Sequence, residues 1–484
     1  MDEFVLKGGL VHRGDGSEPQ EIDISVKKGK IIGFLKATKK NSKNVLDVKG
    51  SVITPGFVEV NAGAYGSRGI FEDPFGMHWI QKGITSVIIG SDGVTPAPLF
   101  ARSATFLQSE YPRASNADWQ SMREFLSVLE RRGTGVNVGT FAGYATLRSA
   151  MTEGYGRDLT VGEIESLGRT ISESLKGGAF GVSFDLSGLY LNRVSSDEIF
   201  RVINATGKFK SVLAFHLRDE RRPVESLAEI LSFFKAHAVN VEVSHFQPLT
   251  EFKDGYLNAA SEIEKISADK NIHFDISPRP IARISIHDLF PVWIKENTLR
   301  RFAEAMKETH VRERMLEAFA GFEADTLTIA VAPKPLKFLE GKTVKDFAVN
   351  RGTSIAEALL TLATLSTMRM EFFSSAVDRE ALEQLLQNNH SIVTLDYWDA
   401  GEGSEPLLEK ILSSEKSIEK ITGAPARKFG LQERGFLKEG YYADIAVFKD
   451  GKPFYVFVNG TAVLEAGILH PELAGRILKN KSEK

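Results

Sequence analysis

The chain has 484 residues, enough for one large α/β unit with an accessory domain. Hydrophobic residues make up 42% and charged residues 25%, which is typical of a globular protein, and 60 basic against 63 acidic side chains give a net charge of −3. This balance argues against nucleic acid or an anionic membrane as a partner, and the absence of cysteine excludes disulfides, thiolate metal ligands and a cysteine nucleophile.

Both ends of the chain have the pattern of β-strands. Apolar and polar residues alternate through the first fifty residues, and again in residues 443–448 and 454–463. The sequence Val458-Asn459-Gly460 predicts a hairpin, because Asn and Gly accept positive φ. We therefore expect a small β-sandwich domain assembled from residues 1–54 and 428–484.

Between the ends, short apolar runs alternate with helical stretches such as residues 161–176 and 226–238. Continuous apolar runs are typical of parallel strands that are buried on both faces. The eight runs cover residues 52–60, 86–91, 136–142, 181–186, 212–217, 239–246, 272–277 and 391–397. This alternation predicts an α/β fold, a (β/α)8 TIM-type barrel over residues 55–427.

The connection between the seventh and eighth predicted strands, about residues 278–390, is far longer than an ordinary barrel loop. Helical patterns at residues 297–308 and 353–364 indicate an inserted subdomain that covers the mouth of the barrel. The first residues lack the features of a signal peptide, and no apolar run reaches the roughly 20 residues of a membrane helix. We expect a cytoplasmic protein without membrane contact.

Barrel enzymes carry their chemistry at the carboxyl ends of the strands. Asp92 follows the second predicted strand there, His216 the fifth, His245 the sixth and Asp396 the eighth. Imidazole and carboxylate suit zinc, manganese or iron, and three such ligands leave a position for water. Each residue also has a structural interpretation: a strand-end histidine is often only hydrogen-bonded, Asp92 lies in a Ser-Asp-Gly turn sequence, and Asp396 could cap a helix.

Several segments together resemble the N-acyl-D-amino-acid deacylase branch of the amidohydrolase superfamily. They are VLDVKGSVITPGFVEV, KGITSVIIGSDGVTPAP, FHLRDE, VSHF, ITGAPARKFGLQERGFLKEGYYADIAVF and FVNGTAVLEAG. They extend from the first strand to the last, so the resemblance covers nearly the whole chain. It implies the same barrel and small domain. Function is implied less directly, because sites diverge on shared folds.

The chain departs from the family at its metal-binding motifs. The family's D-x-H-x-H motif is EVNAG here, residues 59–63, and its cysteine in G-N-C-G is Asp92. His216 and His245 are retained, and Asp396 falls at the position of the family's general acid/base. The resemblance therefore implies one divalent metal ion, expected to be zinc, held by Asp92, His216 and His245, with Asp396 transferring protons.

The resemblance leaves two main hypotheses for function. The first is hydrolysis of a non-peptide C–N amide bond in a small N-acyl amino acid-like substrate, with Arg279 or Arg283 pairing with the substrate carboxylate. The second is a non-catalytic descendant that has lost its metal site and binds a ligand or serves as a scaffold. Metal-free hydrolysis or isomerisation is a third, for which no residue set argues, and a homo-oligomer is left open.

Overall fold

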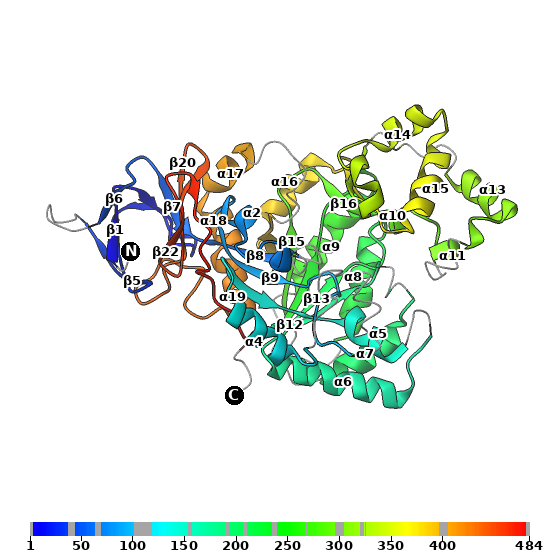
Figure 1. Cartoon of the computed structure of the whole chain (residues 1–484), viewed down its shortest axis with the longest axis horizontal. Helices are drawn as coiled ribbons and strands as arrows, with labels where there is room; N and C mark the ends of the chain where they lie inside the picture. Colours follow the sequence, from blue (N-terminus) through cyan, green and yellow to red (C-terminus); the bar gives the residue numbers. More distant parts are fainter. Residues whose placement is uncertain are drawn as a thin grey trace.

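A computed structural model describes the chain apart from residues 1–2, 37–43, 63–68, 101–118, 153–156, 189–190, 192, 207–210, 235–239, 267–269, 296–303, 320–323, 325, 396–404 and 481–484. A small β-domain lies at one end of the molecule, a parallel α/β region in the middle, and a mainly helical insertion at the other end (Figure 1). Among the described residues, no helix is long and apolar enough to cross a membrane.

The small domain is built from both chain ends. It contains a four-stranded sheet of order β5-β4-β1-β6 and a seven-stranded sheet of order β23-β22-β21-β20-β7-β2-β3. The strands are β1 (Glu3–Lys7), β2 (Leu10–Val11), β3 (Gln20–Glu21), β4 (Asp23–Lys27), β5 (Lys30–Leu35), β6 (Val45–Asp47), β7 (Val52–Pro55), β20 (Ile445–Lys449), β21 (Lys452–Val458), β22 (Thr461–Glu465) and β23 (Ile468–Leu469).

The two chain ends meet where β7 pairs with β20 in antiparallel fashion, and they share one buried core. Phe4 from the first strand stacks on Phe457 from β21, with ring centroids 4.5 Å apart. Asn459 and Gly460 link β21 to β22 with φ of 51° and 80°. The hairpin predicted from these two residues is confirmed, because both adopt the positive φ that a tight hairpin turn requires.

Each of the eight predicted runs of the middle region contains a parallel strand, but the first run, residues 52–60, divides into β7 of the small domain and the parallel strand β8 (Phe57–Ala62). The other parallel strands are β9 (Ile84–Ile89), β10 (Asn137–Thr140) with its continuation β11 (Ala142–Gly143), β12 (Gly181–Asp185), β13 (Val212–His216), β14 (Asn240–Ser244), β15 (Asn271–Ile276) and β19 (Ser391–Val393). Their order in the two ladders, β10-β9-β8 and β11-β12-β13-β14-β15-β19, follows the chain. Consecutive parallel neighbours of this kind are typical of a TIM-type barrel.

The buried Glu59 carboxylate links the first and last of these strands. It lies on β8 and accepts hydrogen bonds from the backbone N–H of Leu395 at 2.6 Å and from the hydroxyl of Thr394, just beyond β19. The same carboxylate accepts the backbone N–H of Asn61 at 2.8 Å. The acidic residue in the altered first-strand motif therefore has a structural role.

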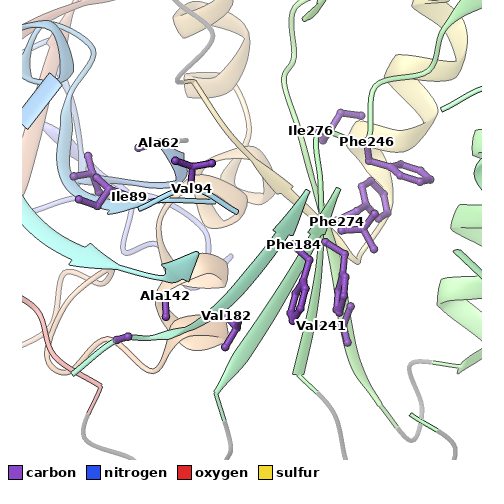
Figure 2. Packing of buried hydrophobic residues seen from close by; sticks show 14 of the residues in the cluster. Ala62, Ile89, Val94, Ala142, Val182, Phe184, Val241, Phe246, Phe274 and Ile276 are labelled. Atoms are coloured by element: carbon purple, nitrogen blue, oxygen red, sulfur yellow. The ribbon is translucent and has the colours of Figure 1, made fainter. Parts of the chain in front are cut away.

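Helices pack on both faces of the strands, with the last of them, residues 423–429, on the face opposite to most of the others. They are α2 (Met77–Ile80), α4 (Met122–Arg132), α5 (Tyr144–Thr152), α6 (Val161–Lys176), α7 (Ser196–Thr206), α8 (Pro223–Ser232), η2 (Thr250–Phe252), α9 (Lys253–Ile266), α16 (Arg379–Gln387), α17 (Glu405–Leu412), α18 (Glu415–Ile421) and α19 (Gly423–Phe429). Helix α6 has the predicted bounds, because Thr160 and Glu163 form a capping box at its start. Phe184, Val241 and Phe274 belong to the core between strands and helices (Figure 2).

The opposite face of the strands has its own core. Val58, Ile88 and Val212 lie there, together with Ala426 and Phe429 of α19. These residues are apolar on a second face of strands that are already apolar toward the helices, which explains the continuous hydrophobic runs in the sequence.

The insertion between β15 and β19 has a separate core and a three-stranded antiparallel sheet of order β16-β18-β17. Its elements are β16 (Ala282–Ser285), α10 (Ile286–Leu289), α11 (Val292–Lys295), α13 (Thr309–Ala318), β17 (Leu327–Val331), η3 (Lys334–Leu339), α14 (Val344–Arg351), α15 (Ile355–Ser366) and β18 (Glu371–Ser374). The predicted helix over 353–364 corresponds to α15, whereas that over 297–308 lies mostly outside the described residues. Helix α16, inside the range expected for the insertion, packs on α9 and β19 instead.

Candidate functional site

Polar side chains gather where the parallel strands end. They are Asn61 on β8, Asp92 after β9, Asp185 on β12, His216 on β13, His245 after β14, and Asp275 on β15. Because the carboxyl ends of parallel neighbours meet at one edge, residues distant in sequence come together here.

Asp92 and His245 form the first pair of the site. Asp92 Oδ1 lies 3.2 Å from His245 Nε2, and both side chains are mostly buried. His245 adopts a left-handed φ of 57°, an uncommon conformation for a residue other than Gly, and its backbone N–H donates to Asp275 Oδ1 at 3.0 Å. The turn after β14 thus directs the imidazole toward the second strand end.

Asn61 joins three of the strand ends. Its Nδ2 donates to Asp275 Oδ1 at 2.7 Å and lies 3.0 Å from His245 Nδ1, while its Oδ1 accepts the hydroxyl of Ser91 at 2.5 Å. Asn61 and Ser91 stand where the resembling family has a metal-ligating histidine and an asparagine. The two departures are therefore in direct contact and form one connected hydrogen-bond network.

His216 lies between two carboxylates. Its Nδ1 is 3.2 Å from Asp185 Oδ1, and its Nε2 is 2.8 Å from Glu220 Oε1. Burial opposes the charged imidazolium, but hydrogen bonds to Asp185 and Glu220 outweigh it, so that the pKa of His216 lies well above its ordinary value. This environment attracts positive charge.

The two imidazole rings are close, with centroids 5.2 Å apart and planes inclined by 67°. Three carboxylates, those of Asp92, Asp185 and Glu220, are within 3.2 Å of a ring nitrogen. Burial also raises the pKa of Asp275, the carboxyl behind His245, despite the opposing influence of that imidazole. The site is thus rich in acidic groups and imidazole.

The donor set fits a divalent cation in its chemistry. Imidazole nitrogen and carboxylate oxygen are common zinc ligands, and two ligands of one tetrahedral ion, each about 2.0–2.1 Å from it, lie roughly 3.3 Å apart. The 3.2 Å between Asp92 Oδ1 and His245 Nε2 matches that spacing. Among the described residues, no group of three His, Asp or Glu side chains is placed to hold a metal ion.

The remaining predicted residues are less closely associated with this cluster. Asp396 lies outside the described residues. Arg279 follows β15, and partial burial lowers the pKa of its guanidinium to about 10, which leaves it charged at neutral pH. Arg283 lies on β16 and forms an ion pair with Glu371 of β18, within the sheet of the insertion.

Two members of the cluster, Asp185 and Glu220, were not among the predicted site residues. Asp185 ends the fourth predicted strand, so the rule that identified Asp92 and His216 applies to it equally. Glu220 follows His216 by four residues within FHLRDE, and only the hydrogen bond between the two side chains indicates its role.

No family model matches the chain, but known proteins are similar to it along nearly its whole length. N-acyl-D-aspartate deacylase of Alcaligenes xylosoxydans xylosoxydans is 25% identical over 96% of this chain and 88% of the relative. Two structures of D-aminoacylase, one of a "novel subset of amidohydrolases" and one of its binuclear metal centre, superpose with TM-scores of 0.81 and 0.78 at 22% identity. Each covers 99% of both chains.

The N-acyl-D-glutamate deacylase of Bordetella bronchiseptica, complexed with zinc and a phosphonate inhibitor, superposes with a TM-score of 0.79 at 21% identity and covers 99% of both chains. The resemblance seen in the motifs thus extends to whole-chain similarity and to the fold. This chain is therefore similar along its whole length to D-aminoacylase and the related N-acyl-D-amino-acid deacylases, and it has the fold of D-aminoacylase.

Proposed function

We propose that this protein is a metal-dependent hydrolase that cleaves the non-peptide C–N amide bond of a small N-acyl amino acid. The observation that carries the proposal is the pairing of Asp92 after β9 with His245 after β14, 3.2 Å apart and next to the His216 ring. The relatives that match along the whole chain are named as deacylases of N-acyl-D-aspartate and N-acyl-D-glutamate and as D-aminoacylase, which supports this substrate class.

Asp92, His216 and His245 are the proposed ligands of the ion, and zinc is the expected metal. When bound, a divalent ion lowers the pKa of a water molecule and polarises a carbonyl. Asp396 is the proposed group that takes a proton and passes it to the leaving amine. Arg279 and Arg283 are the proposed partners of the substrate carboxylate, although the ion pair with Glu371 leaves Arg283 less available than Arg279.

A single metal ion is proposed because Asn61 replaces a histidine of the first-strand motif and directs its amide between His245 and Asp275. An amide nitrogen that donates hydrogen bonds cannot bind a cation at the same time. The structure of D-aminoacylase is described by a binuclear metal centre with one-metal activation and second-metal attenuation, which supports the proposal of one ion.

The finer architecture belongs to the same proposal. We infer that the eight parallel strands close into one barrel over residues 55–427, since Glu59 joins the first strand to the segment after the eighth. The two sheets of residues 1–54 and 428–484 would then pack as a β-sandwich around the core they share. The non-catalytic alternative is not favoured, because the whole-chain relatives are named as enzymes, N-acyl-D-aspartate deacylase and D-aminoacylase.

The test begins with protein purified without a histidine tag. We expect about one zinc per chain by plasma mass spectrometry, and release of free amino acid from N-acyl-D-aspartate, N-acyl-D-glutamate or an N-acyl-D-amino acid with an apolar side chain. The N-acyl-L-amino acids serve as the chirality control. His245→Ala should remove both metal and activity, whereas His310→Ala, at an exposed histidine of the insertion, should remove neither. Full activity in metal-free protein would refute the proposal.

A further inference from the structure

Gln247 links the segments that follow two neighbouring parallel strands, β14 and β15, through its side-chain amide. Its Nε2 donates to the carbonyl of Ser277 at 3.1 Å and to the carbonyl of Arg279. An amide nitrogen has two N–H groups, so these two hydrogen bonds use both of them. Gln247 and Ser277 are only 7% and 2% exposed, so water competes little for these bonds. The amide thus fixes the backbone of the segment that carries Arg279.

The turn that carries Gln247 is held by hydrogen bonds of its own backbone. On one side of Gln247, the N–H of Phe246 donates to the carbonyl of Asp275 at 2.9 Å. On the other side, the carbonyl of Pro248 accepts the N–H of Asp378 at 2.9 Å. Neither bond involves the side chain of Gln247, so we expect the turn to persist when the amide is replaced.

Arg279 stands between two prolines, in a segment with little backbone freedom. Pro278 and Pro280 have φ fixed at about −65° and lack an N–H group, and each restricts the residue before it to extended backbone. The N–H of Arg279 donates to Ser277 Oγ at 3.3 Å. Because the segment is stiff, its contacts with the Gln247 amide determine where the Arg279 backbone lies relative to the turn after β14.

We propose that Gln247 is a positioning residue for substrate specificity: it holds the Arg279 backbone so that the guanidinium pairs with the α-carboxylate of an N-acyl amino acid. A guanidinium binds a carboxylate through two parallel hydrogen bonds only in a defined geometry. Displacement by about 1 Å of a group that orients a substrate can cost about a hundredfold in rate. The inference rests on the proposed pairing of Arg279 with the substrate carboxylate.

The experiment compares two probes that differ only at the group that Arg279 is proposed to bind. N-methanesulfonyl-D-leucine has the α-carboxylate as its single charge, and N-methanesulfonyl-D-leucinamide has a neutral amide in its place. The sulfonamide replaces the scissile amide in both, so that neither is cleaved there. Calorimetry gives the two dissociation constants, and their ratio is the preference for carboxylate. General damage to the site weakens the binding of both probes and leaves this ratio unchanged.

Gln247→Met is the deciding variant, because it keeps the length of the side chain but cannot donate to the two carbonyls. We expect it to lower the preference for carboxylate about tenfold, and Arg279→Met to lower it at least as much. The double variant should match Arg279→Met, because Gln247 acts only through Arg279. Gln432→Met is the matched control: Gln432 Nε2 donates to the carbonyl of Gly430 at 3.1 Å at an exposed position after α19, and this variant should keep the wild-type preference.

Three results would overturn the role of Gln247. The first is an unchanged preference in Gln247→Met. The second is weaker binding of both probes at a constant ratio, since the amide would then only hold the site together. The third is a preference in the double variant clearly below that of Arg279→Met, since Gln247 would then act independently of the guanidinium.

This inference and the proposed function fail in different ways. Wild-type protein without a preference for carboxylate would overturn the pairing of Arg279 and with it the role of Gln247, whatever its hydrolytic activity. Hydrolysis of N-acyl-D-amino acids by the wild type, with an unchanged preference in Gln247→Met, would overturn only the role of Gln247. Preferences in the expected order, without hydrolysis of any N-acyl amino acid, would overturn the proposed reaction and leave the role of Gln247 supported.

Discussion

Replacement of the buried pair Lys428 and Glu242 should change how stability depends on pH. Lys428, on α19, donates to the carbonyls of Val241 and Asn271 at 2.6 and 2.8 Å, and its Nζ is 4.0 Å from Glu242 Oε2. Burial lowers the pKa of Lys428 to about 7. Burial, reinforced by Asp275 and opposed by Lys428, raises the pKa of Glu242 to about 8.

The two groups act over different pH ranges. Between about pH 4.5 and 8, Glu242 holds a proton in the folded state that it has lost in the unfolded state, so its contribution to stability is lost as the pH rises. Between about pH 7 and 10.5, the folded state lacks a proton that Lys428 binds when unfolded, so stability rises with pH. Together the groups place a minimum of stability near pH 7–8.

Each group contributes a slope of at most about 1.4 kcal/mol per pH unit. The Glu242 contribution from pH 5 to 8 is thus at most about 4 kcal/mol, an order-of-magnitude value. In the double variant Glu242→Leu with Lys428→Met this loss should disappear. Urea unfolding of both proteins at pH 5, 6, 7 and 8, followed by circular dichroism, measures the difference. Parallel pH dependences in the two proteins would refute the reasoning.

Three further changes have expected outcomes. Arg148→Met should lower the free energy of unfolding by about 3–5 kcal/mol in urea titration, because it leaves the buried Glu198 carboxylate without the guanidinium that contacts both of its oxygens; a loss below 1 kcal/mol would contradict this. Gly460→Ala should lower the free energy of unfolding by at least about 1 kcal/mol in the same titration, because the φ of Gly460 is 80° and a Cβ there would lie 2.5 Å from Gly29 Cα. A variant as stable as the wild type would show that the hairpin adapts. A chelator should abolish hydrolysis. Added zinc should restore hydrolysis in the wild type but not in Asp92→Ala. If the same zinc concentration restored hydrolysis in that variant, Asp92 would be excluded as a ligand.

Much of the fold could be predicted because its signals are local. The eight apolar runs, the capping box that starts α6, and the Asn459-Gly460 turn each depend on neighbouring residues alone. The boundary between the insertion and the barrel could not be predicted from local signals. Helix α16 is amphipathic, but that pattern does not tell which elements it packs on, and the structure shows that these are α9 and β19.

For the site, sequence identified strand-end residues but not their partners. Asp92, His216 and His245 lie at strand ends as expected, yet His216 faces Asp185 and Glu220 rather than the Asp92–His245 pair alone. Which acidic group meets which nitrogen depends on side-chain directions at the ends of β12 and β13. The loss of the first-strand histidines was visible in the sequence, but the contact between Asn61 and Ser91 was not.

The antiparallel pairing of β7 with β20 has a consequence for biosynthesis. Ile445 of β20 pairs with Pro55 of β7, so the seven-stranded sheet cannot be completed until the ribosome has made the whole barrel and its insertion. Until then β7 has one unpaired edge, and such an edge can pair with other chains and cause aggregation. Chains that end before residue 445 should therefore depend on chaperones, even if their barrel strands have already assembled.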